Sequence, residues 1–206
     1  MTPATHTYQA LIGKTGSYAH TFGHDPKFQA LIPPGGQLPA HLLLSLDMGD
    51  PRLSFLKMNV GPTLRLVHPF HYSQGGTFAY HIGTDGVIFT PAEFDSIGSP
   101  DWPPTDNHPN NYPKQFPSRP VDLEAVSIDP DRFNTDKIFI SHTQPTPQDD
   151  TVGRCQSCKA PTHLFAVVPS TPLPDLDLWG PLGKGVMTIF LYCSSCMAIN
   201  THNSSD

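Results

Sequence analysis

Long apolar runs are missing from this 206-residue chain, and none approaches the ~20 residues that cross a bilayer as a helix. Basic residues are also few, since 12 Lys and Arg stand against 18 Asp and Glu for a net charge of −6. Nucleic-acid binding usually needs a clustered basic face that displaces counterions from phosphates. These shortages predict neither a membrane protein nor a nucleic-acid-binding protein.

An export signal is not visible, because residues 1–11 contain no basic head followed by an apolar stretch. Disulfides persist mainly in oxidising compartments, so cysteines of a protein that is not exported stay reduced. We therefore expect a cytoplasmic protein with free thiols.

Helical periodicity is scarce, whereas proline is abundant: 24 residues are more than twice the ordinary share of about 5%. Proline fits neither helix interiors nor central strands, so much of the chain must form turns, edges and ordered loops. Short runs of Val, Ile, Leu, Phe and Tyr end at Gly, Pro or Asp. This composition predicts a mainly β protein, α+β only in having a few short helices, built from antiparallel meanders.

The expected elements follow from these runs, and the Asp85-Gly86 pair is a strong hairpin signal between two of them. Short helices are predicted over residues 25–32 and 120–128, and residues 1–40 are otherwise expected to be irregular. Residues 91–120 contain eight prolines and are expected to form a long loop. Its expected anchors are the aromatic residues Trp102, Tyr112 and Phe116. Strands are predicted over residues 42–47, 63–67, 77–82, 87–89, 137–141 and 186–192.

All four cysteines fall in two pairs of identical spacing, Cys155-Gln-Ser-Cys158 and Cys193-Ser-Ser-Cys196. A C-x-x-C turn brings two sulfurs to one metal ion, and a second turn completes a tetrahedral shell with Zn–S distances of about 2.3 Å. We predict that these residues bind one structural Zn²⁺ per chain, because four thiolates leave no open position for water or substrate. A disulfide framework lacks the export signal it would need. A thioredoxin-like redox pair is also weaker, because Cys193 ends an apolar strand instead of opening a helix.

The domain organisation is expected to be a β-rich domain over residues 1–150 and a zinc-ribbon-like module over residues 151–206 packed on it as one structural unit. Residues 41–46 (HLLLSL) can be laid on residues 163–168 (HLFAVV) at an offset of 122, which also aligns 64–67 with 186–189. This echo favours an internal duplication in which the second copy alone carries the cysteines. Chance similarity between β-rich segments is the alternative.

A family resemblance rests on Leu173-Pro174, on Trp179-Gly180 and on the strand that ends in Cys193-x-x-Cys196. With these features, residues 42–67 and 155–197 resemble the YwqG-like proteins and their eukaryotic relatives, the programmed-cell-death-2-like proteins. The resemblance implies a duplicated β-rich domain, with one C-x-x-C turn before a strand and another after the next. It also implies protein binding without catalysis, and in some bacterial members a role as an immunity or accessory protein. The chain departs from the usual pattern in having no Pro or Gly inside or after its C-x-x-C turns.

Eleven histidines raise the question of a second metal site. If residues 73–76 form a hairpin tip, His68 lies opposite His81, close enough to share an ion. A structural or surface pair is the simpler interpretation, because Pro69 can break that register and the sequence places no carboxylate nearby. His163 follows Cys158 by five residues and could replace a thiolate, although four cysteines make that unnecessary. Neither a G-x-S-x-G nor an H-E-x-x-H motif is present, so no catalytic residue is predicted.

These observations favour a non-catalytic, zinc-stabilised module that binds a protein partner. The acidic balance and the long loop suit a basic partner, such as the toxin that a bacterial immunity protein would bind. An enzyme with a site on the His68/His81 hairpin is the second hypothesis. A nucleic-acid-binding zinc ribbon is the third, and the shortage of Lys and Arg disfavours it.

Overall fold

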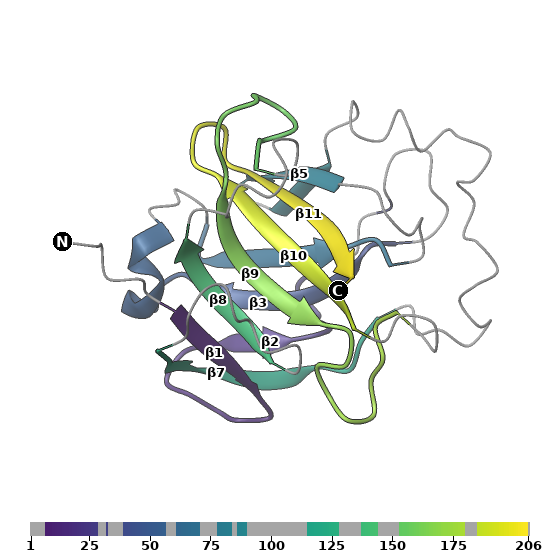
Figure 1. The fold of residues 1–206 in the computed structure, drawn as a ribbon. Helices are drawn as coiled ribbons and strands as arrows, with labels where there is room; N and C mark the ends of the chain where they lie inside the picture. The colour runs from purple at the N-terminus through teal and green to yellow at the C-terminus, as the bar shows by residue number, and fades with distance from the viewer. Residues whose placement is uncertain are drawn as a thin grey trace.

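The computed structural model describes residues 7–28, 32, 39–56, 61–70, 78–83, 86–89, 115–127, 137–143, 153–179 and 185–205. These residues form one antiparallel sheet of eleven strands with a short 3-10 helix, η1 (Pro51–Leu56), beside it (Figure 1). The expected mainly β, antiparallel fold class is confirmed. The strands are β1 (Thr7–Ile12), β2 (His20–Phe22), β3 (His41–Asp47), β4 (Thr63–His68), β5 (Phe78–Gly83), β6 (Gly86–Phe89), β7 (Arg119–Ala125), β8 (Ile138–Thr143), β9 (His163–Pro169), β10 (Val186–Cys193) and β11 (Ala198–Ser205).

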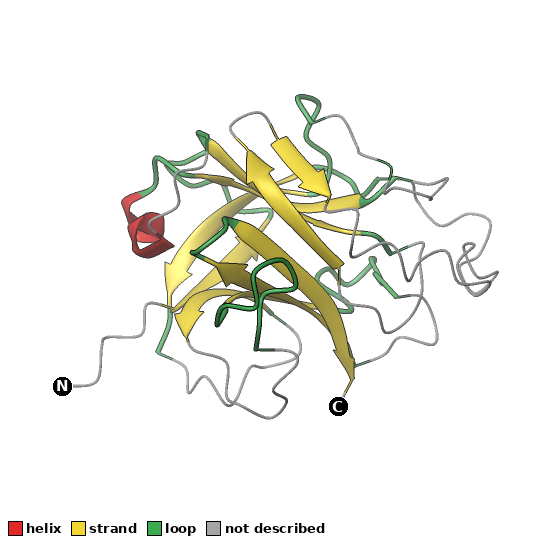
Figure 2. Cartoon of the chain, turned by 90° about the horizontal axis from the view of Figure 1, so that it is seen from above, coloured by secondary structure: helices red, strands yellow, loops and turns green. Residues whose placement is uncertain are grey.

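The sheet is nearly closed on itself, and its strands run in the order β4-β3-β2-β7-β1-β8-β9-β10-β11-β5-β6. Figures 1 and 2 show the strands curving around a common interior. The end strand β4 approaches β5, where the backbone N–H of Val67 donates to the hydroxyl of Tyr80 at 3.1 Å. The ring of His68 also lies 5.6 Å from that of Phe78. Side chains therefore complete the wall where backbone pairing stops.

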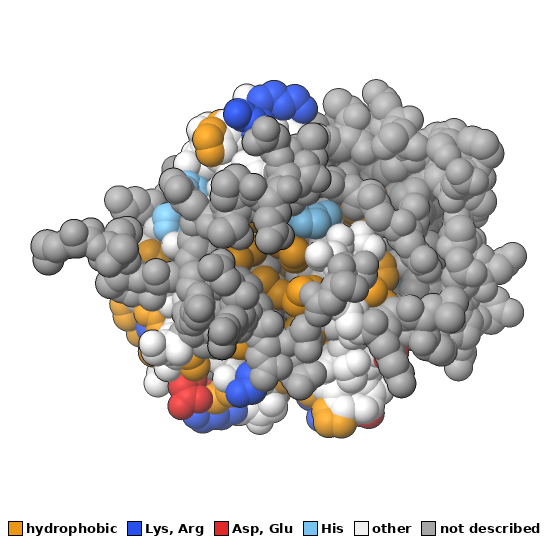
Figure 3. Space-filling view, viewed as in Figure 1, with side chains coloured by type: hydrophobic (Ala, Val, Ile, Leu, Met, Phe, Trp, Pro, Cys, Tyr) orange, Lys and Arg blue, Asp and Glu red, His pale blue; other side chains and the backbone are white. Residues whose placement is uncertain are grey.

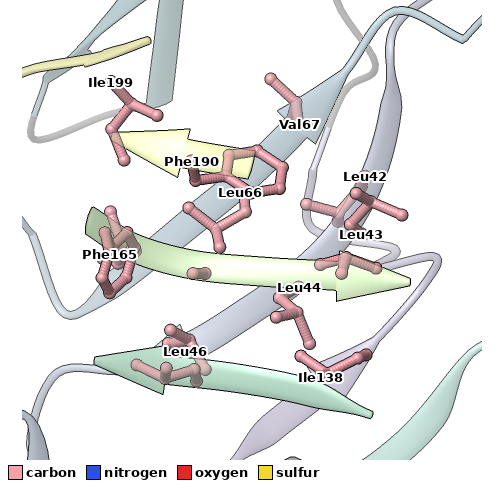
Figure 4. Close-up of a cluster of buried hydrophobic side chains, with 14 of the residues drawn as sticks. Leu42, Leu43, Leu44, Leu46, Leu66, Val67, Ile138, Phe165, Phe190 and Ile199 are labelled. Carbon is pink, nitrogen blue, oxygen red and sulfur yellow. The ribbon is translucent and has the colours of Figure 1, made fainter. Parts of the chain in front are cut away.

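The core fills this interior with aliphatic and aromatic side chains from opposite walls. Leu44 and Leu46 of β3 belong to the same buried cluster as Phe165 of β9 and Phe190 of β10 (Figure 4). Each of these side chains is at most 1% exposed. Full burial of one such side chain contributes about 1.5–3 kcal/mol relative to exposure, so this cluster is the main source of stability.

The internal echo corresponds to two strand pairs with the same construction. β3 pairs with β4 and β9 pairs with β10, both antiparallel. Each first strand carries one extra residue that interrupts the register, Leu43 in β3 and Phe165 in β9, and these two residues are 122 positions apart. The second strands align at an offset of 124, not 122, because Leu66 pairs with Leu44 where Phe190 pairs with Ala166. The ungapped alignment of residues 64–67 with 186–189 is therefore wrong by two residues.

The strand order extends this correspondence to the whole sheet. Reading outward from the β7–β1 pair gives β2, β3 and β4 on one side and β8, β9 and β10 on the other, and β5 pairs with β11 where the sheet closes. If β1–β5 are compared with β7–β11, the first strand of each set pairs with the second strand of the other set: β1 pairs with β8, and β7 pairs with β2. The offset of 122 places Cys155 and Cys158 on Pro33 and Gly36, and the offset of 124 places Cys193 and Cys196 on Pro69 and Tyr72. None of these four residues has a thiol or an imidazole. Only the second of the two similar strand sets therefore carries cysteines, and strands from both sides of residue 150 are neighbours in the sheet.

The prediction of a helix over residues 120–128 is wrong. β7 is a strand in which Val121 and Leu123 alternate with the more exposed Asp122 and Glu124. Pro120 lies opposite Thr21 of β2 and has no N–H to donate, but its carbonyl accepts from Gly13 N–H at 2.7 Å. The alternation of apolar and polar residues covers only residues 121–124, which is too short to distinguish a strand from a helix by its period.

The expectation that residues 1–40 are irregular is also wrong, because β1 and β2 lie there. Of the helix expected after Asp25, the described part is one turn, in which Phe28 N–H donates to Asp25 C=O at 2.9 Å. The strands predicted from apolar runs are confirmed with small differences in bounds, and the Asp85-Gly86 hairpin is confirmed by the β5–β6 pair. Among the described residues no helix is long and apolar enough to cross a membrane.

Candidate metal centre

The four cysteines converge at one rim of the sheet. Their sulfur atoms all lie within 4.8 Å of one another. The Sγ–Sγ distances are 3.4 Å from Cys155 to Cys196, 3.5 Å from Cys158 to Cys193 and 3.6 Å from Cys193 to Cys196. A tetrahedral ion with Zn–S bonds of about 2.3 Å would space its sulfurs about 3.8 Å apart. The cluster therefore matches the size of a four-thiolate metal site.

Two tight turns hold the sulfurs, one before β9 and one between β10 and β11. In the first, Lys159 N–H donates to Cys155 C=O at 2.9 Å and Cys155 N–H donates to Ala160 C=O at 2.8 Å. The residue after each C-x-x-C pair has a left-handed backbone, with φ of 61° at Lys159 and 57° at Met197. Glycine is the residue that adopts this conformation without steric cost. The turns thus have equivalent geometry although the sequence places no glycine after either pair.

This strain leads to a testable expectation at Lys159, whose side chain is exposed. Lys159→Gly should raise the free energy of unfolding by about 0.5–1 kcal/mol, because relief of the left-handed strain outweighs the flexibility gained by the unfolded chain. Chemical denaturation of the metal-loaded protein measures it. Lys159→Ala is the matched control and should give no gain, since it keeps the Cβ. Equal stabilisation by both variants would mean that the Lys side chain, not its backbone, is responsible.

The electrostatics of the cluster favour a bound cation. Burial raises the pKa of the Cys155 thiol. A backbone hydrogen bond from Ala160, assisted by Cys193, lowers the pKa of the Cys158 thiol to about 7. Burial and then the neighbouring sulfurs raise the pKa of Cys196. Without a cation the four sulfurs cannot all be thiolates, because like charges this close repel. A dication would remove that repulsion and allow all four to ionise.

Neighbouring strands fix the outer side of the cluster. The ring Nδ1 of His81, on β5, lies 3.0 Å from Cys196 C=O, and Ile82 N–H donates to Met197 C=O at 3.2 Å. Asn200 on β11 donates through its side-chain amide to Arg154 C=O at 3.3 Å, next to the first turn. Partners that orient ligand residues tune metal affinity in known sites. The second C-x-x-C turn is therefore tied to β5 as well as to its own hairpin.

The proposed facing of His68 and His81 is wrong. β4 and β5 do not form a backbone ladder, so His68 pairs with His41 of β3 whereas His81 pairs with Ala198 of β11. His68 is 1% exposed, and its Nδ1 lies 2.9 Å from the hydroxyl of Thr201. Residues 71–77, which include the expected hairpin tip, lie outside the described residues. The predicted pairing of His68 with His81 assumed that β4 and β5 form a local hairpin. In the structure β5 pairs instead with β11, where the sheet closes.

The imidazole of His163 stacks at 4.5 Å on that of His142. Among the described residues, the one group of at least three His, Cys, Asp or Glu side chains that could hold a metal consists of the four cysteines.

Of the three expected loop anchors, Phe116 is 1% exposed and stacks on His41 at 4.7 Å and on Phe22 at 6.3 Å. Trp102 and Tyr112 lie outside the described residues.

A buried His–Asp pair was missed by the sequence analysis. His20 Nε2 lies 2.8 Å from Asp50 Oδ2, and both side chains are 0% exposed. The other ring nitrogen, Nδ1, accepts the backbone N–H of Asp47 at 3.0 Å, and Arg52 binds the same Asp50 carboxylate at 2.8 Å. Both nitrogens of His20 are thus engaged within the protein, which favours a structural role over general base catalysis. Arg52 is only two residues from Asp50, but His20 lies 30 residues before it, so no local sequence pattern could reveal the pair.

Comparisons of the chain with protein-family models, with curated proteins and with solved structures return no match. The resemblance to the YwqG-like and programmed-cell-death-2-like proteins therefore stays a prediction.

Proposed function

We propose that the chain is a zinc-stabilised, non-catalytic binding protein. Cys155, Cys158, Cys193 and Cys196 hold one structural Zn²⁺ per chain. The convergence of four sulfurs within 4.8 Å carries this proposal. Tetrahedral four-thiolate sites are typical of structural zinc, and the shell leaves no position for a substrate. Elemental analysis of the purified protein should give about one zinc per chain, and metal-free protein with a disulfide between Cys155 and Cys158 would contradict it.

The zinc ion would act as a clamp between segments far apart in the sequence. It joins the segment before β9 to the β10–β11 turn, and that turn is bonded to β5 through His81 and Ile82. The clamp thus lies where the second half of the duplication meets the first. Because metal-bound thiols require reducing conditions, we place the protein in the cytoplasm.

The binding partner is proposed to be a basic protein, such as a toxin bound by an immunity protein. The described residues contain 8 of the 12 basic residues but only 7 of the 18 acidic ones, so the excess negative charge belongs to the other segments. On the face in Figure 3, the described Asp and Glu side chains form only small groups near the lower edge. Residues 84–114 alone contain five acidic residues and one lysine. This long segment is therefore the part of the chain best suited to a basic surface.

The test replaces residues 98–112 with a Gly/Ser linker of equal length and keeps Phe116, which belongs to the core. Pull-down from the native cell should capture a partner with the parent chain but not with this variant, while the zinc content stays the same. Acidic loops speed association by steering, so the on-rate should fall as ionic strength rises. An unchanged partner, or an on-rate independent of salt, would contradict recognition through this segment.

A finer variant separates charge from shape in the same segment. Asp95, Asp101 and Asp106 changed together to Asn should slow association about tenfold at low salt, because steering by clustered charges is worth 10-fold or more. The matched control removes three charges outside the segment, by changing Glu124 to Gln and both Asp175 and Asp206 to Asn. If both sets slow association equally, net charge is responsible instead of the segment.

The enzyme hypothesis loses its motivating geometry, because the His68/His81 register is wrong.

A further inference from the structure

We propose that the cysteine cluster is also an oxidation-sensitive switch, in which a peroxide reacts first at Cys158 and a cross-turn disulfide, Cys158–Cys193, then replaces the metal. The inference rests on the proposed zinc centre and adds a modification site to it. The protein would have two alternative clamps at this rim, zinc under reducing conditions and disulfide under oxidising conditions.

The four sulfurs differ sharply in their access to solvent. Cys155 and Cys193 are 0% exposed and Cys196 is partly buried, whereas Cys158 is exposed. Oxidation of cysteine follows thiolate character and exposure, and metal-bound cysteines are thiolates. A small oxidant arriving from solvent therefore reaches Cys158 first. The buried position of Cys193 protects it from direct oxidation but not from its neighbour.

The chemistry balances with one peroxide per disulfide. The Cys158 thiolate attacks hydrogen peroxide, so that an S–O bond forms, the O–O bond breaks and hydroxide leaves; the product is a sulfenic acid. The Cys193 thiolate then attacks the Cys158 sulfur, an S–S bond forms and a second hydroxide leaves. Sulfur supplies two electrons and peroxide accepts them. Only Cys155 and Cys196 would then remain as ligands for an ion, too few to hold it, and a dithiol reductant would reduce the disulfide and restore all four thiolates.

The structure places a cysteine of the other turn in contact with the exposed Cys158. Cys158 Sγ lies 3.5 Å from Cys193 Sγ, and Cys155 Sγ lies 3.4 Å from Cys196 Sγ, so each contact joins one turn to the other. Cys193 Sγ also lies 3.6 Å from Cys196 Sγ within its own turn, which is the competing pair that the experiment must separate. After the first bond forms, Cys155 and Cys196 remain as the second cross-turn pair. Either bond keeps the segment before β9 attached to the β10–β11 turn.

The first experiment treats the zinc-loaded full-length protein with stoichiometric hydrogen peroxide. A chromophoric chelator measures zinc release, and peptide mapping of the alkylated protein locates the disulfides. We expect about one zinc released per Cys158–Cys193 bond, with both reversed by a dithiol. A predominant Cys155–Cys158 or Cys193–Cys196 bond would overturn the proposal. If the isolated protein contains no zinc, the zinc centre fails separately, and the same mapping on the metal-free chain still decides which sulfurs pair.

The second experiment uses Cys158→His, which removes the exposed thiol but keeps a zinc ligand. Peroxide should release zinc from this variant at least tenfold more slowly than from the parent. Cys155→His is the matched control, because it removes a buried thiol of the other cross-turn pair, and it should change the rate less than threefold. Equal slowing in both variants would show that exposure of Cys158 does not direct the reaction. If Cys158→His binds no zinc, the disulfide map of the parent protein decides alone.

Discussion

Cys193→Ser is expected to remove the metal and to lower the free energy of unfolding by more than about 3 kcal/mol. Cys193 is 0% exposed and ends β10, so the serine cannot recover a ligand by moving, and three thiols are left around a vacant position. Structural zinc binds folded chains far more tightly than unfolded ones, so its binding energy is folding energy. Denaturant titration of parent and variant, each with its zinc content measured, tests the expectation.

The matched control for this variant is the parent protein stripped of zinc by a chelator. Its stability should agree with that of Cys193→Ser within about 1 kcal/mol, because both lack the same ion. A second control, Ser195→Ala, alters the same turn without touching a ligand and should change stability by less than about 0.5 kcal/mol. A Cys193→Ser protein as stable as the zinc-loaded parent would refute the clamp.

Local signals in the sequence were sufficient for the cysteine cluster and for most strands. The C-x-x-C spacing is a property of one turn, and the matching second pair follows a strand that the apolar run 186–192 identifies. β10 and β3 were predictable for the same reason, since most of their residues are apolar and buried. Interactions between neighbours in sequence thus determined what could be foreseen.

Elements whose pattern depends on distant partners could not be foreseen. β11 is rich in Asn, Thr and Ser and has no apolar period, yet it is held between β10 and β5. β2 is only three residues long and owes its pairing to β3 and β7. His68 was misplaced because a local hairpin rule cannot anticipate that β5 pairs with a strand more than 110 residues later. The order of the strands depends on contacts between segments far apart in the sequence, and no short stretch of residues contains that information.

The alignment of residues 41–67 with residues 163–189 shows the same limit in a milder form. The offset of 122 was correct for β3 against β9, including the extra residue at Leu43 and Phe165. It failed by two residues for the second strands because the connection is longer in the second copy. The sequence contains too few identities there to place that insertion. Only the hydrogen-bond register shows which residues correspond.

Lowering the pH should weaken the protein through His68. Burial, with added repulsion from His41 and His202, lowers the pKa of His68 to about 3, against an ordinary value of 6.5. Folded His68 therefore stays neutral where the unfolded chain binds a proton, so its contribution is complete above pH 6.5 and is lost as the pH falls toward 3. The linkage relation gives a loss of about 2 kcal/mol at pH 5.

A His68→Asn variant isolates this contribution, because it removes the titrating ring and keeps a polar group near Thr201. The variant is less stable than the parent at pH 7.5, since it leaves space among Phe70, Phe78 and Trp179, which surround the ring at 4.6–5.6 Å. The difference in free energy of unfolding between parent and variant should shrink by about 2 kcal/mol between pH 7.5 and pH 5. Only the parent loses stability over this range, because its unfolded chain binds a proton at residue 68 that the folded chain does not. Denaturant titrations of both metal-stripped proteins across this range measure the difference, so that acid release of zinc does not contribute. A deficit that stays constant with pH would mean that folded His68 takes up the proton as readily as the unfolded chain, which its enclosure by three aromatic rings and by strand β11 makes energetically costly.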